Sequence, residues 1–169
     1  RHCCEVLAGR PVDDRELADL GHTFADLVRA EVVAAPLIAG NDLRNMSPET
    51  IAILTNKEAI AVNQDSLEIQ GFRYSAEDSL EIWFKPLSKG EWAVCFLNRG
   101  FKAKAITFPW KEHAILDFFS KREINFNQVT FRIRDLWAKK EVSTTKKSFS
   151  LPVHIDEDIF NDFLNDQDS

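Results

Sequence analysis

The stretch LEIWFKPLSKGEWAVCFLN, residues 80–98, contains two runs of strand-forming residues separated by the turn-forming sequence SKGE. In the first run the apolar residues Leu80, Ile82 and Phe84 occupy every second position. Successive side chains of a β-strand point to opposite faces, so this alternation predicts a half-buried strand with these three residues in the core. Trp83 then lies on the wetter face or at a contact with another domain.

Runs of the same type recur on both sides of this stretch, and turn-forming pieces such as SAEDS, NRG and STTKK separate them. Short strands at such regular spacing are typical of an antiparallel sandwich. We therefore predict a sandwich from about Gln70 to Leu151, with no helix across either run of residues 80–98. The other predicted strands are GFRY (71–74), AKAITFPW (103–110), AILDFF (114–119), VTFRIRDLW (129–137) and KSFSLPV (147–153).

The sequence before the sandwich has a different texture. Residues 13–33 place apolar side chains at helical spacing, and VVAAPLIAG (32–40) is a short apolar run typical of a strand covered on both faces in a parallel α/β sheet. Ser47 then suits a helix N-cap and Pro48 the first helical position, which predicts a helix to about Asn56. A second apolar segment follows, so the chain joins an α/β fragment to an all-β module.

A polar turn, GNDLR, lies between the apolar run and the predicted helix. Glycoside hydrolysis needs two carboxylates at a defined separation, and Asp42 and Asp65 are the candidates here. Neither is followed by a second acid from another strand end. The favoured role of the turn Asn41, Asp42 and Arg44 is therefore structural, with Asp42 or Arg44 bonding neighbouring backbone groups or each other.

Composition and charge limit the class of protein. The 169 residues are 44% hydrophobic and 28% charged, with a formal net charge of −6, as in an ordinary globular protein. Binding to a nucleic-acid backbone needs clustered Lys and Arg, and crossing a bilayer needs about 20 consecutive apolar residues. Neither feature occurs, so we expect no nucleic-acid and no membrane partner.

The sequence shows no nucleotide-binding glycine pattern, nucleophile elbow or zinc-protease motif. The four His residues are scattered, and the cysteines, Cys3, Cys4 and Cys95, have no metal-ligand spacing. We therefore expect no cofactor and no metal site. The cysteines leave the redox compartment open.

The residues also carry a family likeness. AAPLIAGNDLRNMSPETIAILTNKEAIAVNQD (34–65), followed by QGFR, LEIWFKPL, WAVCFLNR and IRDLWAKKE, resembles the C-terminal part of the family 27 glycoside hydrolases, the α-galactosidase (melibiase) family. The likeness covers roughly residues 34–151. It implies the end of a (β/α)8 TIM barrel in residues 1–65, an all-β antiparallel C-terminal sandwich in residues 66–152, and an acidic tail in residues 153–169.

The resemblance also implies an activity. The whole enzyme would be a retaining glycosidase that hydrolyses terminal α-D-galactosyl residues of galactose-containing saccharides. The family's two catalytic Asp residues lie on earlier barrel strands and align with no position of this chain. We therefore predict no catalytic and no substrate-binding residue here, and no activity for the chain alone. The compartment stays unknown, with secreted, periplasmic and lysosomal locations implied by the family.

The chain departs from the family pattern in places. It has NQDSLE where the family has NQDPLG, residues 1–33 match poorly, and an acidic tail replaces an expected last strand. A partial barrel cannot close, so its apolar faces must be covered by the sandwich, by a second copy in a homo-oligomer, or by the missing barrel portion. The alternative function is a non-catalytic β-sandwich module that binds carbohydrate or protein through exposed aromatic residues: Trp83, Trp92, Trp110 or Trp137.

Overall fold

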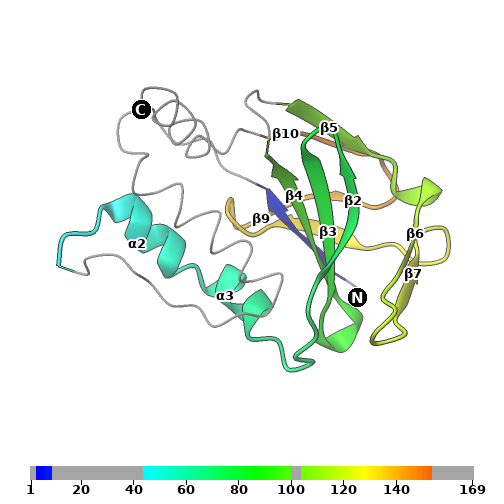
Figure 1. Cartoon of the computed structure of the whole chain (residues 1–169), viewed down its shortest axis with the longest axis horizontal. Helices are drawn as coiled ribbons and strands as arrows, with labels where there is room; N and C mark the ends of the chain where they lie inside the picture. Colours follow the sequence, from blue (N-terminus) through cyan, green and yellow to red (C-terminus); the bar gives the residue numbers. More distant parts are fainter. Residues whose placement is uncertain (1–2, 9–43, 100–103, 154–169) are drawn as a thin grey trace, which may run out of the picture.

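A computed structural model of the chain describes residues 3–8, 44–99 and 104–153 (Figure 1). Two short helices lie in the second of these ranges, and strands make up most of the rest. The helices are α2 (Pro48–Leu54) and α3 (Lys57–Asn63), with single 3₁₀ turns η1 (Ser88–Gly90) and η2 (Trp110–Glu112). The strands are β1 (Cys3–Ala8), β2 (Phe72–Glu77), β3 (Leu80–Pro86), β4 (Trp92–Asn98), β5 (Lys104–Phe108), β6 (Ala114–Leu116), β7 (Glu123–Asn125), β8 (Arg132–Asp135), β9 (Lys140–Thr144) and β10 (Phe149–Val153).

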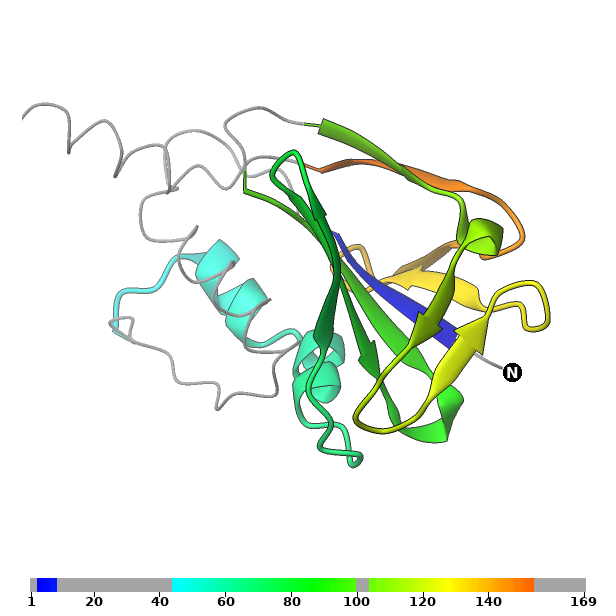
Figure 2. The ribbon, with the colours of Figure 1, turned by 45° about the vertical axis from the view of Figure 1, so that its right-hand side comes forward.

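The strands form one large sheet and two small ones. The large sheet has the order β2-β3-β4-β1-β8-β9, while β10 pairs with β5 and β6 pairs with β7. Figure 2 shows the two small pairs arching over one face of the large sheet, with α2 and α3 on its other side. This arrangement confirms the predicted C-terminal sandwich, because most of the strand pairs are antiparallel.

The main core lies between the large sheet and the two small pairs. Ile82 and Phe84 of β3 are buried in it and Leu80 packs against it, as their alternation predicts. Trp83 faces the other side, where it packs with residues of a second cluster that includes Val62 of α3. The remaining buried members of the main core are Trp92, Val94, Phe96, Ile106, Phe108, Trp110, Ile115, Ile124, Phe126, Phe131 and Ile133.

Helix α2 begins as the sequence predicts. The Ser47 hydroxyl oxygen accepts a hydrogen bond from the N–H of Thr50 at 3.2 Å, and Pro48 occupies the first helical position. The helix ends at Leu54. The second apolar segment is itself a helix, α3, which begins at Lys57 behind its own cap, Asn56.

Some strand boundaries differ from those predicted. The run AILDFF is a strand only to Leu116, because the Asp117 carboxylate accepts hydrogen bonds from the N–H groups of Phe119 and Ser120 and turns the chain. Strands β7 and β9 were not predicted. Strand β9 overlaps the sequence STTKK, which we expected to be a turn, and its residues are mostly exposed and polar.

Strand β1 lies in a region for which the sequence analysis predicts no strand. It runs parallel to both of its neighbours, β4 and β8, in a sheet whose other pairs are antiparallel. The predicted strand at 32–40 and the acidic tail lie outside the described residues, so the division at residues 65 and 152 stays a prediction. Within the described ranges, no helix is long and apolar enough to cross a bilayer.

Candidate functional site at the helix–sheet interface

The predicted structural turn is only partly within the described residues. Asn41 and Asp42 lie outside them, and Arg44 lies in an exposed turn just before α2. The prediction that Asp42 or Arg44 holds this turn therefore stays a prediction. The polar groups that the structure brings together lie further along the chain, where α3 meets the outer face of the large sheet.

Asp65, the other candidate acid, holds a loop in place. Its carboxylate accepts hydrogen bonds from the N–H of Leu67 at 3.0 Å and from the N–H and hydroxyl of Ser88 at 2.9 and 2.6 Å. Burial of the carboxyl opposes its ionisation, but the bonds from Ser88 and Leu67 outweigh that effect and lower the pKa of Asp65. Asp65 thus joins the segment after α3 to the turn between β3 and β4.

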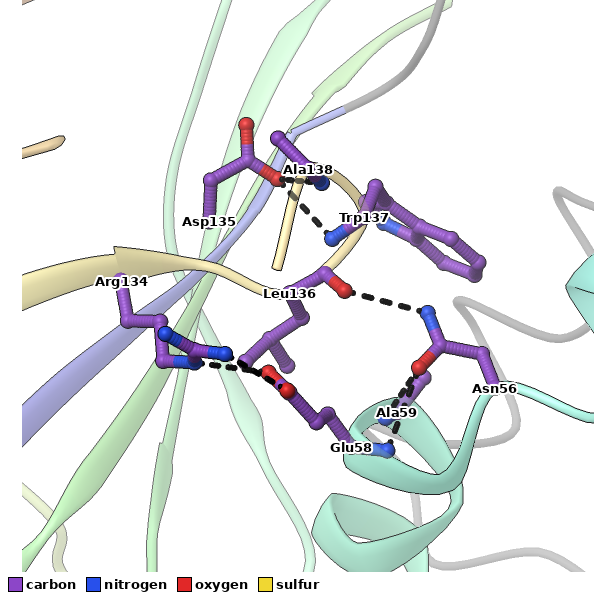
Figure 3. A network of polar contacts seen from close by, with 8 residues as sticks. All are labelled: Asn56, Glu58, Ala59, Arg134, Asp135, Leu136, Trp137 and Ala138. Carbon is purple, nitrogen blue, oxygen red and sulfur yellow. Dashed lines mark hydrogen bonds and ion pairs between the residues drawn. The ribbon is translucent and has the colours of Figure 1, made fainter. Parts of the chain in front are cut away.

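Asn56 is the centre of the interface between α3 and the sheet (Figure 3). The residue is only 2% exposed. Its side-chain oxygen accepts hydrogen bonds from the N–H groups of Glu58 at 3.1 Å and Ala59 at 3.4 Å. Its amide nitrogen donates to the carbonyl oxygen of Leu136 at 3.2 Å. One side chain therefore caps the helix and bonds the turn that follows β8.

A bidentate ion pair reinforces this contact. The Nε and Nη2 groups of Arg134 donate to the two carboxylate oxygens of Glu58 at 2.8 and 2.7 Å. The two side chains are 30% and 33% exposed, so water screens the pair only in part. The hydrogen bond from Arg134 is the largest cause of the lowered pKa of Glu58, and it outweighs the opposing effect of burial.

The turn after β8 is shaped by Asp135. Its carboxylate accepts hydrogen bonds from the N–H groups of Trp137 at 2.9 Å and Ala138 at 2.8 Å. Figure 3 shows the carbonyl of Leu136, between these residues, directed at the amide of Asn56. The Leu136 side chain is fully buried in the second apolar cluster, with Trp137 packed against it.

Lys85 fastens the other end of α3. The residue is 1% exposed, and its ammonium group donates to the carbonyl oxygen of Val62 at 2.7 Å, in the last turn of the helix. Val62 belongs to the second apolar cluster, which covers the outer face of the sheet. The buried members of this cluster are Val62, Leu87, Ala93, Cys95 and Leu136, with Trp83, Leu97 and Trp137 partly buried against them.

Glu81 organises a further group on β3. Its carboxylate accepts hydrogen bonds from Arg73 and Arg99, each at 3.3 Å, and from the indole N–H of Trp83 at 2.9 Å. Burial opposes its ionisation, but the bonds from Trp83 and Arg99 outweigh it and lower the pKa of Glu81. The carboxylate is thus held in its ionised form between two cations.

The four tryptophans are buried or partly buried. Trp92 and Trp110 are buried in the main core, while Trp83 and Trp137 pack against the second cluster. The strongly exposed aromatic residues within the described ranges are Phe118 and Phe119, in the turn after β6. These same ranges hold no group of three or more His, Cys, Asp or Glu residues that could bind a metal ion.

The ion pair predicts a pH dependence that can be tested. Because folding lowers the pKa of Glu58, its contribution to stability is fully present above the ordinary value of 4.5 and is lost as the pH falls through the folded-state pKa. Glu58→Gln should therefore flatten the acid side of the stability curve and leave a smaller difference from the wild type at low pH. Urea unfolding at a series of pH values measures this.

The matched control for this prediction is Glu141→Gln, which removes an exposed carboxylate paired with Arg132. Exposed pairs contribute about 0–1 kcal/mol, so this variant should follow the wild-type curve closely. An equal effect of the two substitutions would show that the Glu58–Arg134 pair stabilises the fold no more than an exposed ion pair does.

Known proteins that resemble this chain include α-galactosidases, and models of α-galactosidase domains match it as well. Residues 77–155 match the family model described as the alpha galactosidase C-terminal beta sandwich domain, and residues 20–65 match the model described as alpha galactosidase A. Alpha-galactosidase A of Cellvibrio japonicus is 50% identical over 121 residues, which are 72% of this chain and 30% of that protein. Alpha-galactosidase 2 of Arabidopsis thaliana is 42% identical over 116 residues, 69% of this chain and 27% of that protein.

A solved structure shows the same fold. Alpha-galactosidase I from Mortierella vinacea superposes with a TM-score of 0.67 at 24% identity, over 89% of this chain and 36% of that one. The sandwich with helices fastened to its outer face therefore has the fold of the C-terminal portion of that alpha-galactosidase. The chain belongs to family 27, the α-galactosidases, and spans about 30% of the length of the first of the curated relatives that it matches.

Sequence reasoning missed the residues that make this interface. A signal for Asn56 existed, because an Asn two residues before an acidic residue and ahead of an apolar run is a recognisable helix start. No local sequence pattern indicated that Glu58 would pair with Arg134 or that Lys85 would bond Val62. Arg134 is far from Glu58 in the sequence, and only the packing of α3 on the sheet brings them together.

Proposed function

We propose that this chain supplies the C-terminal sandwich and the adjoining helices of a retaining glycosidase that hydrolyses terminal α-D-galactosyl residues in oligosaccharides or glycoconjugates. Its role is structural, and the catalytic Asp pair lies in the upstream barrel portion that its relatives contain. The observation that carries the proposal is the fastening of α3 to the sheet by Asn56, by the Glu58–Arg134 pair and by Lys85. These contacts make the helix and the sandwich one unit.

Three carboxylates, Glu58, Asp65 and Glu81, are placed as structural groups and not as a catalytic acid. Retaining hydrolysis needs two carboxyl groups about 5–5.5 Å apart, of which the acid/base has a raised pKa. Glu58, Asp65 and Glu81 all have a lowered pKa, and each accepts hydrogen bonds from groups that hold the fold. Such carboxylates are poor general acids because they remain ionised.

The proposed partners follow from the family of the chain and from its negative net charge. The whole enzyme binds a galactose-containing saccharide, and the acidic chain binds neither nucleic acid nor a membrane. The exposed part of α2 includes Ile51, whose cover would come from the upstream barrel portion or from a second copy of the chain. The compartment stays open.

A complementation assay tests this proposal. The full chain is mixed with a separately expressed barrel fragment of the Cellvibrio japonicus relative that ends before the matched region. We expect the two pieces to associate and the mixture to hydrolyse a chromogenic α-galactoside, while the chain alone does not. General acid–base catalysis alone contributes about 10²- to 10⁴-fold, so the difference should be large.

The barrel fragment alone is the control, and its turnover must stay well below that of the mixture. Association is measured separately by analytical ultracentrifugation. Equal turnover with and without the chain, together with no association, would contradict a structural role for this portion.

A further inference from the structure

Strand β1 is the sole link between two halves of the large sheet in the described structure. The strand order β2-β3-β4-β1-β8-β9 places it between the antiparallel group β2, β3 and β4 and the antiparallel pair β8 and β9. Residues Cys4–Ala8 pair with Trp92–Phe96 of β4, and residues Cys3–Val6 pair with Arg132–Asp135 of β8, both in parallel. In Figure 1 the strand crosses the middle of the molecule.

Of the two strands beside β1, β4 is among the most buried that the structure describes, whereas β8 is buried at Ile133 and more exposed elsewhere. Residues 92–96 of β4 are all buried, and Ile133 of β8 is fully buried. Without β1, the backbone N–H and C=O groups along both facing edges would lose their partners in the middle of the sheet. Buried backbone groups without partners are rare and costly, so this position requires a strand.

The register fixes which positions of the segment lie opposite which residues of its neighbours. In register, Cys4, Val6 and Ala8 align with Trp92, Val94 and Phe96 of β4. These three β4 residues belong to the main core. Glu5 aligns with Ala93 of β4 and Arg134 of β8. The register therefore places residues 4, 6 and 8 opposite main-core positions of β4, and residue 5 opposite Arg134 of β8.

We propose that the gap between β4 and β8 is a strand-binding site that takes one extended peptide parallel to both strands, and that residues 3–8 are its occupant. Neither neighbour is joined to β1 by a hairpin, so backbone pairing with both strands holds the segment. This is β-strand addition, in which the ladder supplies affinity and alternate positions supply specificity. The same peptide added as a separate molecule binds the site when residues 3–8 are prevented from filling it.

Val6→Pro in the full chain is the variant that should displace residues 3–8 from the gap between β4 and β8. Val6 pairs with Val94 on one side and Asp135 on the other, and proline has no N–H and a fixed φ, so the substitution breaks the ladder in its middle. Amide hydrogen exchange should accelerate in β4 and β8 by roughly tenfold to a hundredfold, the effect of losing one or two net hydrogen bonds. Val6→Thr keeps the N–H and the branched shape and should retain slow exchange.

A peptide of residues 1–10, kept reduced, is then titrated into the Val6→Pro chain. We expect saturable binding and a return of slow exchange in β4 and β8, whereas the peptide carrying the Val6→Pro change has no effect. Unchanged exchange in β4 and β8 of the variant, or no response to the peptide, would overturn the proposal. If the variant does not fold alone, recovery of native tryptophan fluorescence with the peptide supports the site, and failure to recover overturns it.

Discussion

Replacing Phe84 by alanine is expected to lower the free energy of unfolding by about 3–5 kcal/mol. Phe84 is 0% exposed and lies in the main core between the large sheet and the small pairs. Its ring lies 5.5 Å from that of Tyr74, 6.1 Å from that of Phe108 and 6.5 Å from that of Phe72, measured between centroids. Truncation leaves a cavity among aromatic rings, whose rigid shapes limit collapse around it.

Urea unfolding followed by tryptophan fluorescence measures this loss. The matched control is Phe119→Ala, which removes the same side chain from a residue that is 93% exposed. That variant should lie within about 0.5 kcal/mol of the wild type. A loss below about 1 kcal/mol for Phe84→Ala would mean that the sandwich core is packed differently.

Replacing Asn56 by alanine is expected to cost about 2–3 kcal/mol. Two effects combine, because the cap of α3 is worth about 0.5–2 kcal/mol and the buried carbonyl of Leu136 loses its donor, at about 1–3 kcal/mol. The loss should also free α3 from the sheet. Hydrogen exchange across residues 57–63 should therefore accelerate more than exchange in β3.

Asn56→Ser separates the two effects. Serine retains a capping oxygen but cannot reach the carbonyl of Leu136, so its cost should lie between the wild type and Asn56→Ala. If serine and alanine cost the same, the cap contributes nothing. If both leave stability unchanged, α3 is not fastened to the sheet through this residue.

Short-range patterns predicted much of this fold correctly. The alternation of Leu80, Ile82 and Phe84 gave the strand and its main-core face, and Ser47 with Pro48 gave the start of α2. The strand is not half-buried as predicted, because Glu81 and Lys85 on its other face are buried as well. These signals work because a strand face and a helix cap depend on residues only two or three positions apart. The family resemblance, which residues 34–151 carry, placed these elements in a sandwich.

The strands that the sequence did not predict were missed for two reasons. Strand β9 has the polar composition of a turn, although it pairs with the adjacent strand β8, and the partners of β1, β4 and β8, lie far along the chain. The candidate site has the same limit. Glu58 and Arg134 meet only after α3 packs on the sheet, and Asp65, considered as an acid in the sequence, is held by Ser88 from a later loop.

The central claim, that this chain gives a glycosidase its C-terminal framework without its catalytic carboxylates, is tested most directly by the rate at which the purified chain alone hydrolyses a chromogenic α-galactoside. We expect a rate equal to the uncatalysed background, and the same rate for Asp42→Asn, because retaining hydrolysis needs two positioned carboxylates. Substantial hydrolysis by the chain alone, abolished by Asp42→Asn, would contradict the account and make the turn before α2 catalytic.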